Sequence, residues 1–137
     1  MYTISKEFHF SASHILFGLE DGHPCGRMHG HNYVIVVELQ SQSLNKITGF
    51  VKDYRELDPI KKFIDDELDH RHLNNILDPF AIEEQDRAPR SLFPGNPSAE
   101  NMARVLFDVF QYLVPDVKIS AVIVKETPKT AARYERN

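Results

Sequence analysis

The chain has little of what disulfide-stabilised, membrane-spanning or nucleic-acid-binding proteins depend on. Its 137 residues include one cysteine, Cys25, so no internal disulfide can form, which fits a reducing compartment and leaves the thiol available for chemistry. No apolar run approaches the roughly 20 residues that span a bilayer. Sixteen basic against twenty acidic residues give a formal charge of -4 with no basic tract, which argues against nucleic acid as a ligand.

The composition is otherwise that of one soluble globular domain. An apolar fraction of 42% and a charged fraction of 26% are ordinary, and 137 residues fill one core but not two. We therefore expect a single domain over residues 1–137. Residues 1–6 lack the basic-then-apolar layout of a secretion signal, so we expect a cytoplasmic protein without a membrane partner. Seven histidines raise the expectation of a metal site.

Two histidines that are two residues apart open a segment with strand composition. His29 and His31 precede the β-branched and apolar run 32–39, and the period of two in a strand puts both imidazoles on one face. Gly30 between them removes a side chain that would crowd a shared cation. Cys25 lies four residues upstream of His29.

A third histidine falls in register at the end of an earlier strand. Residues 2–13 alternate apolar and polar side chains, which predicts a half-buried strand. Continuing that register puts His14 on the apolar face, whereas His9 falls on the polar face and is expected at the surface. His14, His29 and His31 would supply three nitrogen ligands and leave a fourth tetrahedral position open, as in catalytic zinc sites. The alternative is three ordinary polar histidines at strand ends.

The middle of the chain predicts a helix and then a long connection. The helix has one buried stripe and runs to about residue 70, with its start undecided between Asp53 and Asp58. The segment 78–97 carries four prolines and no periodicity, and structureless connections of that length usually form a lid or a mobile loop. The apolar stripe of the helix comprises Leu57, Ile60, Ile64 and Leu68.

The last third of the chain predicts a second helix followed by two strands. Ser98 is the N-cap of a helix that ends at Val114-Pro115, and strand composition returns over 118–126 and 131–134. The resulting order is strand, strand, helix, helix, strand, strand. Such segregation predicts an α+β fold with an antiparallel sheet and the helices on one face.

Five motifs, taken together and in order, resemble one known family. They are FHFSASH at 8–14, CGRMHGHNY at 25–33, LDHRHLN at 68–74, PSAEN at 97–101 and VKET at 124–127. The chain resembles the 6-pyruvoyl-tetrahydropterin synthase family over nearly its whole length. The three residues between Cys25 and His29 are most similar to the bacterial 6-carboxy-tetrahydropterin synthases of queuosine biosynthesis. The connection 78–97 departs from the family, because it is longer than in compact bacterial members.

The resemblance implies a T-fold, a four-stranded antiparallel sheet with two helices on one face. It also implies trimers that form a β-barrel and pair as hexamers, with sites between subunits. The implied reaction converts 7,8-dihydroneopterin triphosphate to 6-carboxy-5,6,7,8-tetrahydropterin and releases acetaldehyde and triphosphate. By motif position, zinc would bind His14, His29 and His31, proton transfer would use Cys25, Asp69 and His70, and the pterin would be held by Glu126.

The chemistry of these side chains agrees with the implied roles. Cys25 can act as a base if His70 takes up its proton, and Asp69 would orient that imidazole, although adjacent residues in one helix cannot simply face each other. The two oxygens of Glu126 match the two parallel N–H donors of a pterin edge. Arg27 adds a cation with bidentate reach for a phosphate or a developing carboxylate. Zinc would act as a Lewis acid on the substrate's side-chain oxygens.

Each role has an alternative. Cys25 is a fourth zinc ligand or inert, Asp69-His70 is a solvated pair at a helix end, and Glu126 and Arg27 are solvated surface residues. His23 and His72 have no spacing argument and are expected at the surface. For the whole protein, the alternatives are a 6-pyruvoyl-tetrahydropterin synthase, which keeps the side chain intact, and a non-catalytic pterin-binding module with a closed zinc site.

Overall fold

Two long strands form the centre of the sheet. The computed structural model describes residues 1–75, 84–89 and 92–136, with the side chain of residue 84 left aside. Strand β1 (Tyr2–His14) and strand β2 (His29–Ser41) pair antiparallel along their whole length, from Tyr2 opposite Ser41 to His14 opposite His29. Both strands were predicted, and the alternation of buried and exposed residues along them explains why. All three candidate histidines lie on this hairpin.

Three shorter strands extend the sheet on both sides. Strand β4 (Ile119–Thr127) pairs antiparallel with β2, and strand β5 (Thr130–Glu135) pairs antiparallel with β4, as expected. Strand β3 (Arg71–Leu73) runs parallel to β1 on the other side, so the sheet has five strands in the order β3-β1-β2-β4-β5. The prediction of a four-stranded, purely antiparallel sheet was wrong in this respect. Three residues are too few to show a period of two.

The first helical segment changes its winding twice. The 3-10 helix η2 (Tyr54–Leu57) leads into helix α1 (Asp58–Phe63), which continues as the π-helical turn η3 (Ile64–Leu68). Both candidate starts are used, since Asp53 caps η2 through the Arg55 N–H and Asp58 lies in the first turn of α1. The whole predicted stripe is buried, and it consists of Leu57, Ile60, Ile64 and Leu68.

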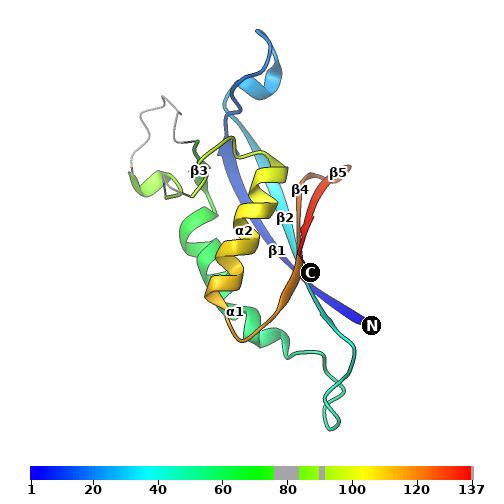
Figure 1. Cartoon of the computed structure of the whole chain (residues 1–137). Coiled ribbons are helices and arrows are strands. Elements are labelled where there is room, and N and C mark those ends of the chain that lie inside the picture. The colour runs from blue at the N-terminus through cyan, green and yellow to red at the C-terminus, as the bar shows by residue number, and fades with distance from the viewer. Residues whose placement is uncertain (76–83, 90–91, 137) are drawn as a thin grey trace.

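The second helix, α2 (Ala99–Leu113), begins and ends as predicted. Its N-cap is Ser98, whose side chain accepts the Asn101 N–H, and Val114 is its C-cap. The buried residues of both helices belong to the same core cluster as the inward face of β1 and β2, and Figure 1 shows α2 packed across the sheet. No helix in the described ranges is long and apolar enough to cross a bilayer.

Part of the 78–97 connection is structured, whereas residues 76–83 and 90–91 lie outside the described residues. The 3-10 helix η4 (Glu84–Asp86) is followed by the buried Ala88, whose N–H donates to the His72 carbonyl at 2.9 Å. Phe93 is also buried and forms an isolated bridge with Asn75. Ala88 therefore lies against β3 and Phe93 against the residues that follow it, an order that the expectation of a structureless segment missed.

Candidate metal and substrate site

Three histidines gather at the closed end of the β1–β2 hairpin, as their spacing predicted. His14 lies opposite His29 in the strand register, and His31 lies opposite Ala12. The Nε2 atoms of His14 and His29 are 3.0 Å apart, and ligand atoms of all three imidazoles lie within 4.8 Å of one another. Among the described residues, no cysteine, aspartate or glutamate joins these three histidines, which together can hold a metal ion.

Backbone carbonyls fix the orientation of two of these rings. The Nδ1 of His14 lies 2.8 Å from the Pro97 carbonyl oxygen, and the Nδ1 of His29 lies 2.7 Å from that of Arg27. A carbonyl only accepts, so each Nδ1 carries the proton and each Nε2 presents a lone pair. Two lone pairs that face each other across 3.0 Å repel unless a cation lies between them. This donor set therefore fits a metal such as zinc.

The electrostatics favour the neutral form of two of the three imidazoles, His14 and His31. Burial lowers the pKa of His14 to about 4, assisted by the neighbouring His29 and His31 and opposed by the hydrogen bond to Pro97. Burial also lowers the pKa of His31, against the attraction of Glu126. A neutral imidazole is the form that binds a metal, so the lowered pKa values of His14 and His31 favour metal binding.

Cys25 lies outside the histidine cluster, in the short 3-10 helix η1 (Pro24–Gly26) beyond the hairpin end. Its thiol is half-buried, and its backbone N–H donates to the His23 Nδ1 at 3.1 Å. His23, expected at the surface, is half-buried and caps this turn. The alternative of a closed site with Cys25 as the fourth ligand has no support in this geometry.

Asp69 and His70 do face each other, because they follow the helix rather than belong to it. His70 has φ 61°, in the left-handed region, and its Nδ1 lies 3.0 Å from Asp69 Oδ1. The same oxygen accepts the Ser11 N–H at 3.0 Å, and this bond lowers the pKa of Asp69, with a smaller contribution from His70. The His70 N–H donates to the Ser11 carbonyl at 2.7 Å. The pair is thus fastened to β1, while the His70 ring is largely exposed.

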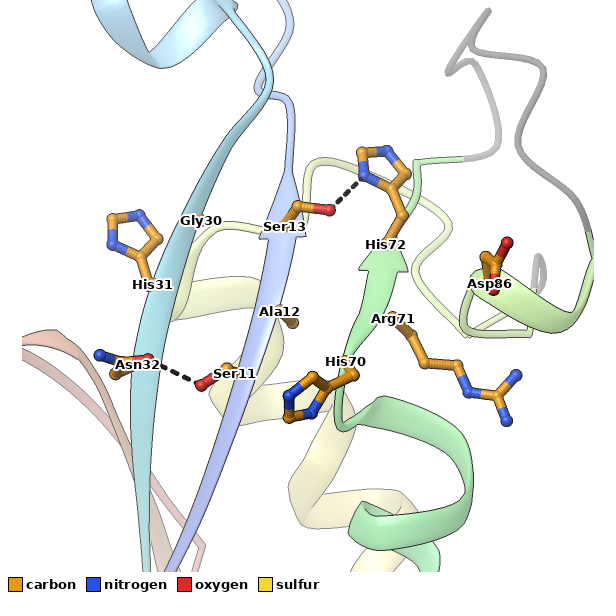
Figure 2. Close-up of a pocket in the computed structure, with 10 residues that line it drawn as sticks. All are labelled: Ser11, Ala12, Ser13, Gly30, His31, Asn32, His70, Arg71, His72 and Asp86. Carbon is orange, nitrogen blue, oxygen red and sulfur yellow. Dashed lines mark hydrogen bonds between the residues drawn. The ribbon is translucent and has the colours of Figure 1, made fainter.

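A cavity of about 510 Å³ opens between β1, β2 and β3 (Figure 2). His31 and His70 both line it, so the candidate metal ligand and the candidate proton carrier border one space. A second cavity of about 480 Å³ is lined by Glu126 and shares His31 with the first. The Nε2 of His31 lies 3.9 Å from Glu126 Oε2. The structure therefore places Glu126 and His70 on the two sides of one candidate ligand.

His72 was expected at the surface, and that expectation was wrong. It is only 3% exposed, and its Nδ1 lies 2.9 Å from the Ser13 Oγ within the first cavity (Figure 2). Its burial follows from β3, where His72 pairs with Ser13 in the parallel register. No sequence signal marks that strand, so reasoning from the sequence missed both His72 and Ser13 as cavity residues.

Gly30 and Arg27 each have a structural role that the sequence did not indicate. Gly30 lies on the opposite face from His29 and His31 and lines both cavities, so a side chain there would project into the cavities rather than toward the histidine cluster. Its missing Cβ would lie 3.4 Å from the Ala12 carbonyl oxygen. The backbone carbonyl of Arg27 accepts a hydrogen bond from the His29 ring. The side chain of Arg27 is exposed, and its anion-binding role stays a prediction.

The fold and site together define a small α+β protein whose sheet carries a cluster of three histidines that can hold a metal ion. Comparisons with known proteins place it further. Residues 3–137 match the sequence model of the family described as 6-pyruvoyl tetrahydropterin synthase. The chain belongs to this family.

Relatives in the family carry two product names. The chain is 28% identical to the 6-carboxy-5,6,7,8-tetrahydropterin synthase of Aquifex aeolicus, over 98% of each chain. It is 30% identical to the Haemophilus influenzae protein of the same name, over 98% of this chain and 99% of that one. The solved structure of Caenorhabditis elegans 6-pyruvoyl tetrahydropterin synthase superposes with a TM-score of 0.76 and 28% identity, over 99% of this chain and 96% of that one.

Proposed function

We propose that the protein converts 7,8-dihydroneopterin triphosphate to 6-carboxy-5,6,7,8-tetrahydropterin, with release of acetaldehyde and triphosphate. The observation that carries the proposal is the three-histidine cluster, whose member His31 borders a cavity with His70 on one side and a cavity with Glu126 on the other. The names of the Aquifex and Haemophilus relatives support this product. The reaction would serve queuosine biosynthesis.

Zinc, when bound by His14, His29 and His31, would supply Lewis acidity toward the oxygens of the substrate side chain. Glu126 would accept the paired N–H donors of the pterin. The imidazole of His70, held by Asp69, is placed to move protons at the side-chain carbons from the other side of His31. A pterin anchored at Glu126 would thus extend its side chain past the metal toward His70.

The thiol of Cys25 completes the proposed set as the base. Cys25 is not among the residues that line the cavity of His31 and His70. We therefore propose that the working site forms between subunits of a homotrimer or a hexamer, where a neighbouring copy supplies the facing half. The exposed edge strand β5 agrees with assembly through the sheet. The proposed location is the cytoplasm.

Product analysis tests the proposed reaction. The zinc-loaded protein is incubated with 7,8-dihydroneopterin triphosphate, the pterin is identified by mass spectrometry, and volatile acetaldehyde is trapped. We expect one acetaldehyde for each 6-carboxy-5,6,7,8-tetrahydropterin. A pterin that retains all three side-chain carbons would overturn the proposal.

The second candidate is triphosphate elimination without side-chain cleavage, which yields 6-pyruvoyl-tetrahydropterin. It is favoured by the Caenorhabditis structure, whose 28% identity equals that of the Aquifex relative. Both reactions need a metal and proton transfer at carbon, so the site residues serve either. The trapped acetaldehyde separates the two reactions.

A further inference from the structure

One asparagine side chain pairs with the backbone of the thiol loop as a neighbouring strand would. Asn96 accepts the Phe17 N–H through Oδ1 at 2.9 Å and donates from Nδ2 to the Phe17 carbonyl at 2.8 Å. Both backbone groups of Phe17 are therefore satisfied by one amide. Only a side-chain amide offers a donor and an acceptor in this arrangement, because a carboxylate lacks the donor.

Phe17 lies in the segment to which the thiol turn is fastened. The preceding residue, Leu16, donates its N–H to the Cys25 carbonyl at 3.0 Å. The Cys25 N–H is held in turn by His23. Holding Phe17 in place therefore also fixes the backbone that anchors Cys25.

The residue after Asn96 orients a candidate metal ligand. The Pro97 carbonyl accepts the His14 Nδ1–H at 2.8 Å, and this bond directs the His14 Nε2 toward His29. The Asn96 carbonyl accepts from the Asn101 side chain at 2.9 Å, which anchors the same peptide segment to the first turn of α2. A displacement of Asn96 would pass directly into the Pro97 carbonyl.

We propose that Asn96 is a positioning residue that fixes the Cys25 loop and the His14 ring through one peptide segment. Its side chain holds the loop at Phe17, and its backbone carries the carbonyl that orients His14. The part given to Cys25 as a base rests on the proposed function, whereas the link itself is a matter of geometry. The Cys25 loop and the His14 ring of one subunit thereby keep fixed positions relative to each other.

The test measures thiol reactivity and metal release in the zinc-loaded protein. Cys25 is the one cysteine, so labelling by an aromatic disulfide reports on its loop alone. Asn96→Ala removes both hydrogen bonds to Phe17, and also the longer one that Asn75 Nδ2 donates to the Asn96 Oδ1 at 3.3 Å. We expect labelling to become about tenfold faster, as for a loss of about 1.4 kcal/mol. Zinc release to a chelator should accelerate by about tenfold, the low end for residues that orient metal ligands.

Two further variants separate positioning from general stability. Asn96→Asp keeps the acceptor for the Phe17 N–H but loses the donor, so both rates should fall between those of the wild type and Asn96→Ala. If Asn96→Ala does not fold, Asn96→Asp carries the test. Ser98→Ala is the matched control, because it removes the cap of α2 two residues away and leaves the Asn96–Phe17 pair intact. Its labelling and zinc release should match the wild type.

The proposal is overturned if the Asn96 variants label and release zinc at wild-type rates, or if Ser98→Ala accelerates both rates as much as they do. Neither measurement requires turnover, so this link and the proposed reaction fail separately. Fast labelling in Asn96→Ala, in a protein that releases no acetaldehyde, would support the link and refute the reaction.

Discussion

The three-histidine cluster and the residues proposed for proton transfer are held by the fold in opposite ways. The three histidines lie on two paired strands, and two of the rings are fixed by backbone carbonyls. Cys25 lies in a three-residue turn, and the side chain of His70 is 82% exposed. The part of the site that would stabilise charge is preorganised within one chain, whereas the part that would move protons faces outward. The second part is the one that an assembly would complete.

Removal of one of the three proposed metal ligands should have the largest effect, because no other described residue belongs to the cluster and could replace it. We expect His29→Ala to lose most of its zinc, as measured by elemental analysis of the purified protein. His9→Ala is the control, since His9 lies on the exposed face of β1 and should leave zinc unchanged. Full zinc occupancy in His29→Ala would remove the proposed metal site.

Removal of the thiol should separate the two parts of the site. Cys25→Ala is expected to keep its zinc and its melting temperature but to lose about a hundredfold or more in turnover, the usual contribution of a positioned base. The measurements are steady-state rates, elemental analysis and thermal unfolding. Loss of zinc in this variant would instead make Cys25 a ligand, and an unchanged rate would exclude it from catalysis.

Glu126→Gln should weaken substrate binding without affecting metal binding by the three-histidine cluster. An amide offers one acceptor where the carboxylate offers two, and charge-assisted hydrogen bonds contribute roughly 1.5 to 3 kcal/mol each. We expect an affinity for the pterin about tenfold lower or worse by calorimetry. Glu135→Gln, on the exposed edge strand β5, is the control. A variant with wild-type affinity would refute the anchoring role.

The smallest effect concerns the tie between Asp69 and β1. The Ser11 N–H lowers the pKa of Asp69 below its usual 3.8, so its ionised form stabilises the fold above that pH, and this contribution is lost as the pH falls through the folded-state pKa. Because the side chain is 33% exposed, Asp69→Asn should cost less than about 1 kcal/mol at pH 7. In urea unfolding of the metal-free proteins, the difference should shrink toward pH 3. A constant difference would contradict this account.

Reasoning from the sequence reached the features that repeat along the chain. A period of two placed His14, His29 and His31 on one face, and a helical stripe placed Ile60 and Ile64 in the core, because burial imposes those periods. The caps of the helices were equally visible, since Ser98 stands directly before an apolar stripe.

Features that depend on contacts between distant segments had no such signal. Strand β3 is three residues long, so neither its parallel pairing nor the burial of His72 against Ser13 could be predicted. Asn96 and Phe17 are 79 residues apart, and nothing in either neighbourhood indicates the other. Gly30 was predicted only to keep the space around a cation clear, and its place in the lining of both cavities had no signal in the sequence.

The π-helical turn η3 acts as an insertion of one residue into the helix, and this insertion does not change which residues are buried. The N–H of Asp69, the C-cap of this turn, donates to the carbonyl of Ile64, five residues earlier, at 2.9 Å. In an α-helix the partner is four residues earlier, so the π-helical turn contains one more residue. Ile64 and Leu68 stay buried all the same. Deletion of one residue within η3 would leave the buried stripe of the helix recognisable. It would move Asp69 and His70 away from the backbone groups of Ser11 with which they form hydrogen bonds. The position of His70, the proposed proton carrier, thus depends on the number of residues in the turn, independently of their side chains.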